Sequence, residues 1–450
     1  MKGKIGLVSL GCPKNLVDSE IMLGLLKEDE WEITPDKSQA DIIIINTCGF
    51  LKTAVEESVN TILEMAACKK GKCKVLIAAG CMAERYGEEV LKEMPEVDGL
   101  IGPARCAEIT GALRMALEGK RPVLCGNAGN TSYDIGCLES KRIVSTPKGY
   151  AYLKIAEGCD NFCTYCTIPH IRGRYRSRKM EDLLKEAEFL AEGGAKEVIL
   201  VAQDTTRYGA DLYSERMLPQ LLRQISGVKG VEWIRLLYCY PDEIDDVLID
   251  EIAGNEKICK YIDVPIQHSS DRILAAMGRR GGKKQIRSLI ENLRDRIPGV
   301  IIRTSLIVGF PHESEEDFED LCGFVEEIRF DRLGVFKYSK EEGTPAAGIK
   351  PAISEKVKNK RYKHIMLLQE NISETKNKSR LGRTYRTLVE GISDDGIFYC
   401  GRTYAEAPDV DGKIFFASSE PLHAGDFANV RILDCDKHDL IGEVENESAQ

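Results

Sequence analysis

The first 120 residues alternate short, almost continuous apolar runs with amphipathic stretches. The apolar runs are "KIGLVSLG" (4–11), "ADIIIINT" (40–47) and "KVLIAAG" (74–80). Runs of this kind are typical of strands buried on both faces of a parallel sheet. Residues 14–27 and 52–67, which lie between them, have the periodicity of helices. The β-α-β-α order predicts an open parallel α/β sheet.

The same alternation returns six times between residues 150 and 339. The predicted strands are "AYLKIAEG", "EVILVAQD", "EWIRLLYCY", "YIDVPIQ", "VIIRTSLIVGF" and "RLGVFKYS". Amphipathic segments such as "MEDLLKEAEFLAEGG" and "SEEDFEDLCGFVEEI" separate the runs and predict helices. Six βα units are fewer than a complete barrel needs, so we expect a partial (βα)6 barrel.

The pattern changes again after the sixth unit. A Pro/Gly loop at 340–353 precedes a charged segment at 354–379, which predicts a helix that leads away from the barrel. From 381 onward, short alternating runs with Asp/Gly turns predict a small antiparallel β-barrel. We therefore expect an α/β domain at 1–120, a linker at 121–144, the partial barrel at 145–376 and the terminal β-barrel at 377–447.

Length and composition fit a soluble protein with several domains. The chain has 450 residues and a formal charge of −10, which predicts no general attraction to nucleic acid. The apolar run in "MKGKIGLVSLGC" is too short for a signal peptide, and no run reaches the roughly 18 apolar residues of a membrane span. We expect the sixteen cysteines to be cytoplasmic thiols or metal ligands rather than disulfides.

Three cysteines lie close together after the first predicted barrel strand. In "EGCDNFCTYC" (157–166) their spacing is Cys159-x3-Cys163-x2-Cys166, and we refer to them as the barrel cysteines. Three thiolates can hold three corners of a cubane iron–sulfur cluster, which leaves the fourth iron open, as in a catalytic metal site. Zinc is the alternative, but it would need a fourth ligand at short range, and the offset of His170 does not match zinc spacing.

Three more cysteines each follow one apolar run of the N-terminal region. Cys12 ends "SLGC", Cys48 ends "NTC" and Cys81 ends "AAGC"; we refer to them as the N-terminal cysteines. Because the carboxyl ends of parallel strands lie along one edge of a sheet, we expect these thiols to meet and hold a second cluster. The alternative is that each is a small buried core residue, as free cysteines often are.

These motifs resemble a known family. The barrel cysteines, with Tyr165 just before the last of them, resemble the cluster motif of the radical S-adenosylmethionine (SAM) enzymes. The segments "SLGCPKNLVDSE" (9–20), "INTCGF" (45–50) and "AAGC" (78–81) resemble the N-terminal domain of the methylthiotransferases. The terminal β-barrel resembles their TRAM domain, so the resemblance covers residues 3 to 447 with the domains in the same order.

The resemblance implies SAM and two [4Fe–4S] clusters as cofactors. SAM would chelate the open iron at the barrel cysteines, and its reductive cleavage would give a 5′-deoxyadenosyl radical. The N-terminal cysteines would hold the auxiliary cluster, whose free iron is thought to carry the sulfur to be inserted. The reaction replaces C–H by C–S–CH3, and an external electron donor and a sulfur source are implied as partners.

Polar residues at predicted strand ends are candidate SAM contacts, because in the superfamily such positions meet the amino group, ribose and adenine of SAM. The candidates are Tyr165, Gln203, Asp204, Gln267, His268, Arg303 and Gly309. The alternative is that they are ordinary polar caps at strand ends. The family usually has glycine after "GFP", whereas this chain has His312, which leaves the conformation of that loop open.

The run "RGRYRSR" (172–178) is the densest group of basic residues. It fits a solvated loop, a contact to the SAM carboxylate or a substrate clamp, and the sequence does not discriminate between them.

Two features bear on the substrate. Family members modify either a tRNA adenosine or the β-carbon of an aspartate in the twelfth small-subunit ribosomal protein. "SLGCPKNLVDSE" resembles the ribosomal-protein branch, whereas the tRNA branch usually has Gln-Met in place of Pro13-Lys14. Residues 380–450 carry seven Lys/Arg and fourteen Asp/Glu, which predicts attraction to a basic protein and no stable binding of nucleic acid.

Within this acidic region, we expect the aspartates of the Asp/Gly turns to be exposed. They are Asp394, Asp395, Asp409 and Asp411. A tRNA adenosine methylthiotransferase remains the alternative function. A non-enzymatic iron–sulfur carrier is disfavoured, because it needs neither open irons nor a barrel of this size.

Overall fold

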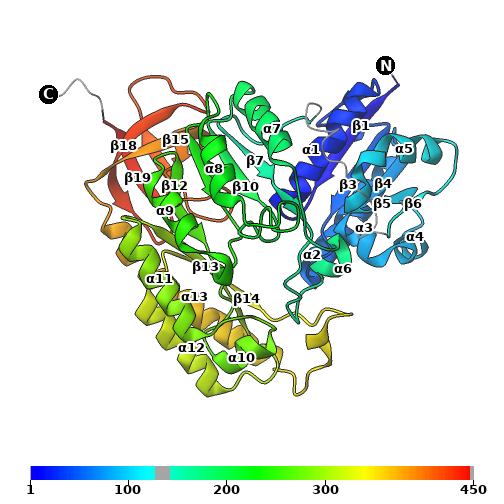
Figure 1. The fold of residues 1–450 in the computed structure, drawn as a ribbon. Helices are drawn as coiled ribbons and strands as arrows, with labels where there is room; N and C mark the ends of the chain where they lie inside the picture. Colours follow the sequence, from blue (N-terminus) through cyan, green and yellow to red (C-terminus); the bar gives the residue numbers. More distant parts are fainter. Residues whose placement is uncertain (1, 127–141, 446–450) are drawn as a thin grey trace.

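The computed structural model describes residues 2–126 and 142–445. An N-terminal α/β domain and a terminal β-barrel lie on opposite sides of a central barrel (Figure 1). Among the residues described, no helix combines the length and the apolar character that a membrane crossing requires.

The N-terminal domain is built on a parallel sheet of six strands in the order β2-β1-β3-β4-β5-β6. The strands are β1 (Lys4–Ser9), β2 (Glu32–Ile33), β3 (Ile42–Thr47), β4 (Val75–Gly80), β5 (Gly99–Ile101) and β6 (Val123–Leu124). The helices are α1 (Pro13–Glu28), α2 (Lys52–Ala66), α3 (Cys81–Tyr86), α4 (Glu88–Glu93) and α5 (Ile109–Leu117). Every residue of β3 and β4 is buried, which explains their continuous apolar runs. The predicted open parallel sheet is confirmed.

The central domain is an open barrel of six parallel strands in the order β14-β13-β12-β11-β10-β7. The strands are β7 (Tyr150–Lys154), β10 (Glu197–Val201), β11 (Trp233–Leu236), β12 (Ile258–Asp263), β13 (Ile301–Val308) and β14 (Arg332–Lys337). The helices are α7 (Met180–Glu192), α8 (Leu218–Ser226), α9 (Asp246–Gly254), α10 (Asp271–Ala276), α11 (Lys283–Arg296) and α12 (Glu315–Ile328). The sequence therefore predicted the partial barrel correctly.

A two-stranded antiparallel pair closes the base of the loop after β7. β8 (Ala156–Glu157) pairs with β9 (Arg176–Ser177), and the short helix α6 (Ile168–Arg172) lies between them. The barrel cysteines and most of the basic run therefore belong to one loop, which is anchored at both ends.

The terminal domain is a closed barrel with the strand order β15-β16-β17-β19-β18. Its strands are β15 (Thr384–Ile392), β16 (Tyr399–Arg402), β17 (Ile414–Ala417), β18 (Phe427–Cys435) and β19 (Leu440–Val444). This confirms the predicted small β-barrel. A closed barrel has no free strand edge, and its interior is filled by a compact apolar cluster.

Three expectations need correction. The helix α13 (Glu355–Lys378) does not lead away from the barrel, because Ile365 and Ile372 are buried in the barrel core. Most of the expected linker, 121–144, lies outside the described residues, but its first part forms β6 at the edge of the N-terminal sheet. The side chain of Asp411 is only 2% exposed, so the prediction that this turn aspartate faces solvent was wrong.

Candidate active site

The N-terminal cysteines lie on three loops that touch one another. Cys12 precedes α1, Cys48 follows β3 and Cys81 is the first residue of α3. A Cβ on Gly11 would lie 3.1 Å from the Cys48 Sγ, and one on Gly49 would lie 2.7 Å from the backbone of Cys81. The loops approach so closely that only glycine fits at these two positions. The structure therefore brings these cysteines together, as the sheet geometry predicted.

Asn15, which the sequence did not single out, holds the loops in place. Its Nδ2 donates to the carbonyls of Leu10, at 3.0 Å, and Thr47, at 2.9 Å, so one fully buried amide joins two of the cysteine loops. Asn46 in turn donates to the Asn15 carbonyl at 2.7 Å. Both asparagines lie within or beside the motifs that carry the family resemblance, and this contact explains their presence there.

Positive charge surrounds the N-terminal cysteines. Burial raises the pKa of Cys81 to about 12 and also raises that of Cys48. Burial opposes ionisation of Cys12 as well, but Lys14 and Arg172 outweigh it and hold the pKa of the Cys12 thiol below its ordinary value. Because thiolates are the form that binds iron, the two cations favour the state that a cluster needs.

Arg172 connects these cysteines to the barrel domain. It is 2% exposed, its Nε lies 3.4 Å from the Cys81 Sγ, and its Nη1 pairs with Asp18 at 3.1 Å and Glu157 at 2.9 Å. Its Nη2 donates to the side-chain oxygen of Asn15. The first arginine of the basic run is thus a buried bridge between domains, a role that no sequence pattern indicated.

The rest of the basic run divides into exposed and buried groups. Arg174 is exposed and pairs with Asp160 at 2.8 Å, whereas Arg178 is buried and pairs with Glu186 at 2.6 Å. The run is therefore neither a uniformly solvated loop nor a single clamp.

The barrel cysteines lie in the loop between β8 and β9, at the carboxyl end of the barrel strands. Burial raises the pKa of Cys159 to about 11. The Cys166 Sγ accepts a hydrogen bond from the backbone N–H of Ile168 at 3.5 Å, and Arg279 reaches to 4.0 Å from the Cys163 Sγ. Burial also raises the pKa of Cys166, and the N–H of Ile168 opposes this shift only in part.

A loop of the barrel holds both cysteine regions. Glu341 accepts a hydrogen bond from the backbone N–H of Lys52, at the start of α2, at 3.0 Å and pairs with Arg85 of α3 at 2.8 Å. In the same loop, Ala346 donates to the carbonyl of Thr164, between the barrel cysteines, at 2.9 Å. This loop therefore ties the segments after Cys48 and Cys81 to the barrel cysteines.

Two buried polar oxygens in or beside the loop of the barrel cysteines, the Oδ1 of Asn161 and the Oε1 of Gln203, have no hydrogen-bond partner within 2–126 and 142–445. The Nε2 of His268 has none either, but the charged neighbours of this histidine lie on α10, α12 and α13. Buried polar groups normally find a partner, so the two oxygens fit a polar ligand. The amide of Gln203 also donates to Glu157 at 2.9 Å, which links it to Arg172.

Backbone strain gathers at the same strand ends. Phe162, Tyr238, Gln267 and His312 have φ values of +47°, +62°, +70° and +67°. Such left-handed conformations in non-glycine residues are often found at functional sites. His312 keeps the conformation that the usual glycine of the family would adopt readily, and histidine is among the residues that tolerate it.

Three of the remaining SAM candidates, Tyr165, Asp204 and Gln267, lie at the carboxyl end of the barrel. Asp204 accepts a hydrogen bond from Asn161 at 2.8 Å, and the backbone N–H of Gln267 donates to the carbonyl of Ser305 at 2.9 Å. Gly309 follows β13 with a φ of +74°, and a Cβ there would meet the side chain of Lys358, so backbone conformation and packing together account for this glycine.

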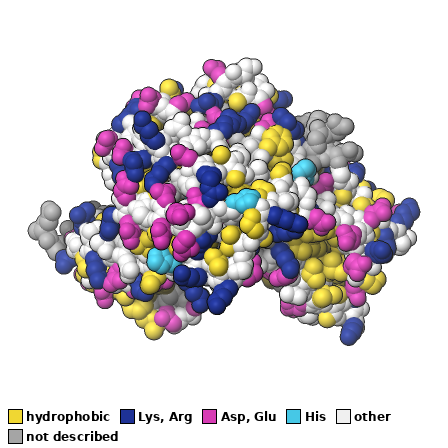
Figure 2. Space-filling model, turned by 90° about the horizontal axis from the view of Figure 1, so that it is seen from below, with side chains coloured by type: hydrophobic (Ala, Val, Ile, Leu, Met, Phe, Trp, Pro, Cys, Tyr) yellow, Lys and Arg dark blue, Asp and Glu magenta, His cyan; other side chains and the backbone are white. Residues whose placement is uncertain are grey.

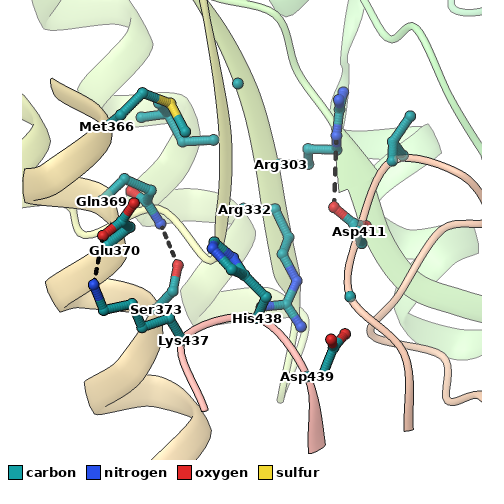
Figure 3. A pocket seen from close by; sticks show the side chains of 14 residues that line it. Arg303, Arg332, Met366, Gln369, Glu370, Ser373, Asp411, Lys437, His438 and Asp439 are labelled. Carbon is teal, nitrogen blue, oxygen red and sulfur yellow. Dashed lines mark hydrogen bonds and ion pairs between the residues drawn. The ribbon is translucent and has the colours of Figure 1, made fainter. Parts of the chain in front are cut away.

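Arg303 is not gathered with the other candidates. It lies near the amino end of β13, pairs with Asp263 at 2.9 Å and points toward Asp411 of the terminal barrel at 3.8 Å (Figure 3). A cavity of about 360 Å³ adjoins it between α13, β13, β14 and the terminal barrel. A structural contact therefore accounts for this arginine.

The cysteines form two sets of three, each with nearby cations or N–H donors. A cubane takes one thiolate per iron, so each set could supply three of its four positions and leave one open.

Comparison with known proteins agrees with this geometry. The chain matches the Uncharacterized protein family UPF0004 at residues 4–102, the Radical SAM superfamily at 153–325 and the TRAM domain at 381–444. In fold it is similar to the radical SAM methyltransferase TsrM from Kitasatospora setae, with a TM-score of 0.56, 15% identity and 77% of each chain covered. The superfamily match implies SAM and a [4Fe–4S] cluster.

Curated relatives are much closer in sequence. The chain is 57% identical to "Ribosomal protein uS12 methylthiotransferase RimO" of Acetivibrio thermocellus, with 100% of both chains covered. It is 49% identical to the protein of the same name from Clostridium tetani, again over 100% of both, and 51% identical to that of Pelotomaculum thermopropionicum, over 98% of this chain and 99% of the relative. The chain therefore belongs to the RimO family of methylthiotransferases, which are radical SAM enzymes.

Proposed function

We propose that this enzyme methylthiolates the β-carbon of an aspartate in ribosomal protein uS12, using SAM and two [4Fe–4S] clusters. The main observation in support is the junction at Arg172. This residue belongs to the loop of the barrel cysteines and donates to the Sγ of Cys81, so the loop that carries one set of cysteines contacts the other set across the domain junction.

Each part of the site has a role in the proposal. The barrel cysteines would hold the cluster that binds SAM, and the N-terminal cysteines would hold the auxiliary cluster. When bound, these cofactors supply the radical that removes hydrogen and the sulfur that is inserted. Gln203 and Asn161 offer buried polar atoms for SAM.

The proposed substrate rests on the relatives and on charge. The curated relatives carry uS12 in their names, and the excess of acidic residues in the terminal barrel suits a basic protein partner. On the face seen from below, Lys/Arg and Asp/Glu side chains are interspersed and do not form a basic band (Figure 2). Nucleic-acid binding usually relies on clustered positive charge.

A competition assay tests the proposal. Anaerobically reconstituted enzyme should contain about eight iron atoms, two cubanes of four. With SAM, reductant and a sulfide source, it should methylthiolate a uS12 peptide and leave a tRNA anticodon arm unmodified. Replacing the barrel cysteines with alanine should remove about four irons and all SAM cleavage. Modification of the tRNA alone would support the alternative function instead.

A further inference from the structure

Almost every buried cation of the described chain has a carboxylate partner. The paired ones are Arg142, Lys154, Arg172, Arg178, Arg235, Lys358, Arg361 and Arg402. Within residues 2–126 and 142–445, the buried lysines and arginines without an ion pair are Lys14 and Arg279. Both lie beside cysteines of the candidate site.

Arg279 is accounted for by the loop of the barrel cysteines. It donates to the carbonyl of Pro265 at 2.5 Å, lies 4.0 Å from the Cys163 Sγ, and stacks at 3.9 Å over the ring of Tyr240. Its donors are thus directed to the protein and to a cysteine.

Lys14 lacks comparable partners. It is 7% exposed and lies two residues after Cys12, and its Nζ is 3.3 Å from the ring centroid of Tyr238 at the end of β11. The first turn of α1 contains no acidic residue. An ammonium on an aromatic face is favourable, but it still has N–H donors for an anion.

The nearby carboxylates are already engaged. Asp18, one turn further along α1, pairs with Lys154 and Arg172. Asp263, which accepts a hydrogen bond from the backbone of Tyr238 at 2.9 Å, pairs with Arg303. Lys14 therefore has Tyr238 and the Cys12 thiol beside it but no carboxylate partner in the described structure, and burying a charge is costly unless it is paired.

Resting on the function proposed above, we infer that Lys14 is a specificity residue that binds the side-chain carboxylate of the substrate aspartate. It lies beside Cys12 of the N-terminal domain and over Tyr238, which follows a barrel strand, and so at the junction of the two domains. A carboxylate held there would present the adjacent β-carbon at this junction. The rival explanation is that Lys14 only balances the charge of Cys12 and its cluster.

Two substrate peptides distinguish recognition of the aspartate carboxylate from charge balance at Cys12. Binding of two uS12 peptides to the reconstituted holoenzyme is measured by anaerobic fluorescence anisotropy, one peptide with the aspartate and one with asparagine in its place. Wild-type enzyme should prefer the aspartate peptide by roughly ten- to a hundredfold, the size expected for a charge-assisted hydrogen bond. Lys14→Met should reduce this ratio to about one by weakening only the aspartate peptide, and the iron content of each variant is measured alongside.

Lys358→Met is the matched control. Lys358 is also 7% exposed and also lies near a tyrosine ring, that of Tyr338 at 5.4 Å, but it has the partner Glu355 at 2.7 Å. This variant should keep the wild-type preference. Lys14→Arg should restore most of it, and Lys14→Gln, which keeps a donor without the charge, should lose it even if the methionine variant fails to load iron.

The outcomes are distinct. If Lys14→Met and Lys14→Gln weaken both peptides equally, or keep the wild-type ratio, then Lys14 only supports the cluster or the fold and the inference is wrong. If wild-type enzyme forms no methylthiolated product from the aspartate peptide, the proposed function itself fails.

Discussion

The two junctions of the central barrel use similar charged residues but differ in how completely these are paired. At the amino ends of the strands, Glu197 pairs with Arg235 at 2.5 Å and with Arg402 of the terminal barrel at 2.7 Å, and all three side chains are at most 1% exposed. Glu406 of the terminal barrel likewise pairs with Arg332 at 2.9 Å.

At the carboxyl ends, the pairing is incomplete. Arg172 and Glu157 form a buried pair there too, but six cysteines, an orphaned oxygen of Gln203 and the ammonium of Lys14 are left for other partners. At the first junction the guanidinium groups have carboxylate partners, although the Nε atoms of Arg332 and Arg380 lack a hydrogen-bond partner, and this pairing stabilises the arrangement of the domains. The second junction has buried ion pairs too, but it adds thiols and an ammonium without carboxylate partners, which is what a binding site requires.

The largest expected effect is the loss of methylthiolated product when the cysteines at the carboxyl-end junction are replaced. Replacing Cys12, Cys48 and Cys81 with alanine should abolish methylthiolation and remove about four of about eight irons. Reductive SAM cleavage should persist, because the barrel cysteines lie on another domain. Mass spectrometry of the uS12 peptide and quantification of 5′-deoxyadenosine measure the two effects. Product formed by the triple variant would show that these cysteines are core residues.

Substitutions at the amino-end junction should change the free energy of unfolding and leave the cluster sites unchanged. Glu197→Gln leaves the buried Arg235 without its counterion and Arg402 with Glu390 alone, which should lower the free energy of unfolding by roughly 3–5 kcal/mol. Urea denaturation measures this, and iron content should stay unchanged. Arg386→Ala breaks an exposed pair with Glu232 near the same junction and removes a guanidinium 3.8 Å from the ring centroid of Phe427, which together should cost about 1 kcal/mol. Equal effects of the two variants would contradict the comparison.

The free energy of unfolding should depend on pH through His268. Burial lowers the pKa of this histidine to about 4, with Asp317 and Asp320 opposing the shift only in part. The pKa of His268 is about 4 in the folded protein and about 6.5 in the unfolded chain. As the pH falls from about 6.5 to about 4, the unfolded chain therefore takes up a proton before the folded protein does, and the free energy of unfolding decreases. The loss at pH 4 should be about 3 kcal/mol relative to pH 7.

His268→Gln provides the comparison for this effect. The variant should lack that component of the acid sensitivity, so the difference between wild-type and variant unfolding curves should grow over this pH window. Parallel curves between pH 7 and 4 would show that the histidine titrates normally.

The smallest effect concerns the exposed acids of the terminal barrel. Asp394 and Asp395 are exposed, and replacing both with lysine should weaken binding of uS12 by about two- to fivefold at low salt, with little effect at 1 M salt. Asp411→Asn is the contrast, because this aspartate accepts a hydrogen bond from Tyr261 at 2.7 Å and faces the barrel. It should change stability and leave the salt dependence of binding as in wild type.

The features that the sequence predicted are those that follow from runs of apolar residues. Each cysteine follows a run of apolar residues, and such runs predict strands whose carboxyl ends share one edge, so the meeting of the N-terminal cysteines followed from periodicity alone. The six-stranded barrel and the terminal β-barrel were recognised in the same way. Short strands such as β5 and β6 were missed, because three or two residues carry no periodic signal.

What the sequence determined by itself is the set of elements and the positions of the thiols along them, because both follow from local patterns of apolar residues. The partners of the charged side chains were decided only by the tertiary structure. Arg172 resembled any other arginine of a basic run until α1 supplied Asp18 and Asn15, and Asp411 resembled a turn residue until Tyr261 and Arg303 faced it. A charge is paired, exposed or left open according to which domain packs against it, and that information lies in contacts between residues far apart in the chain.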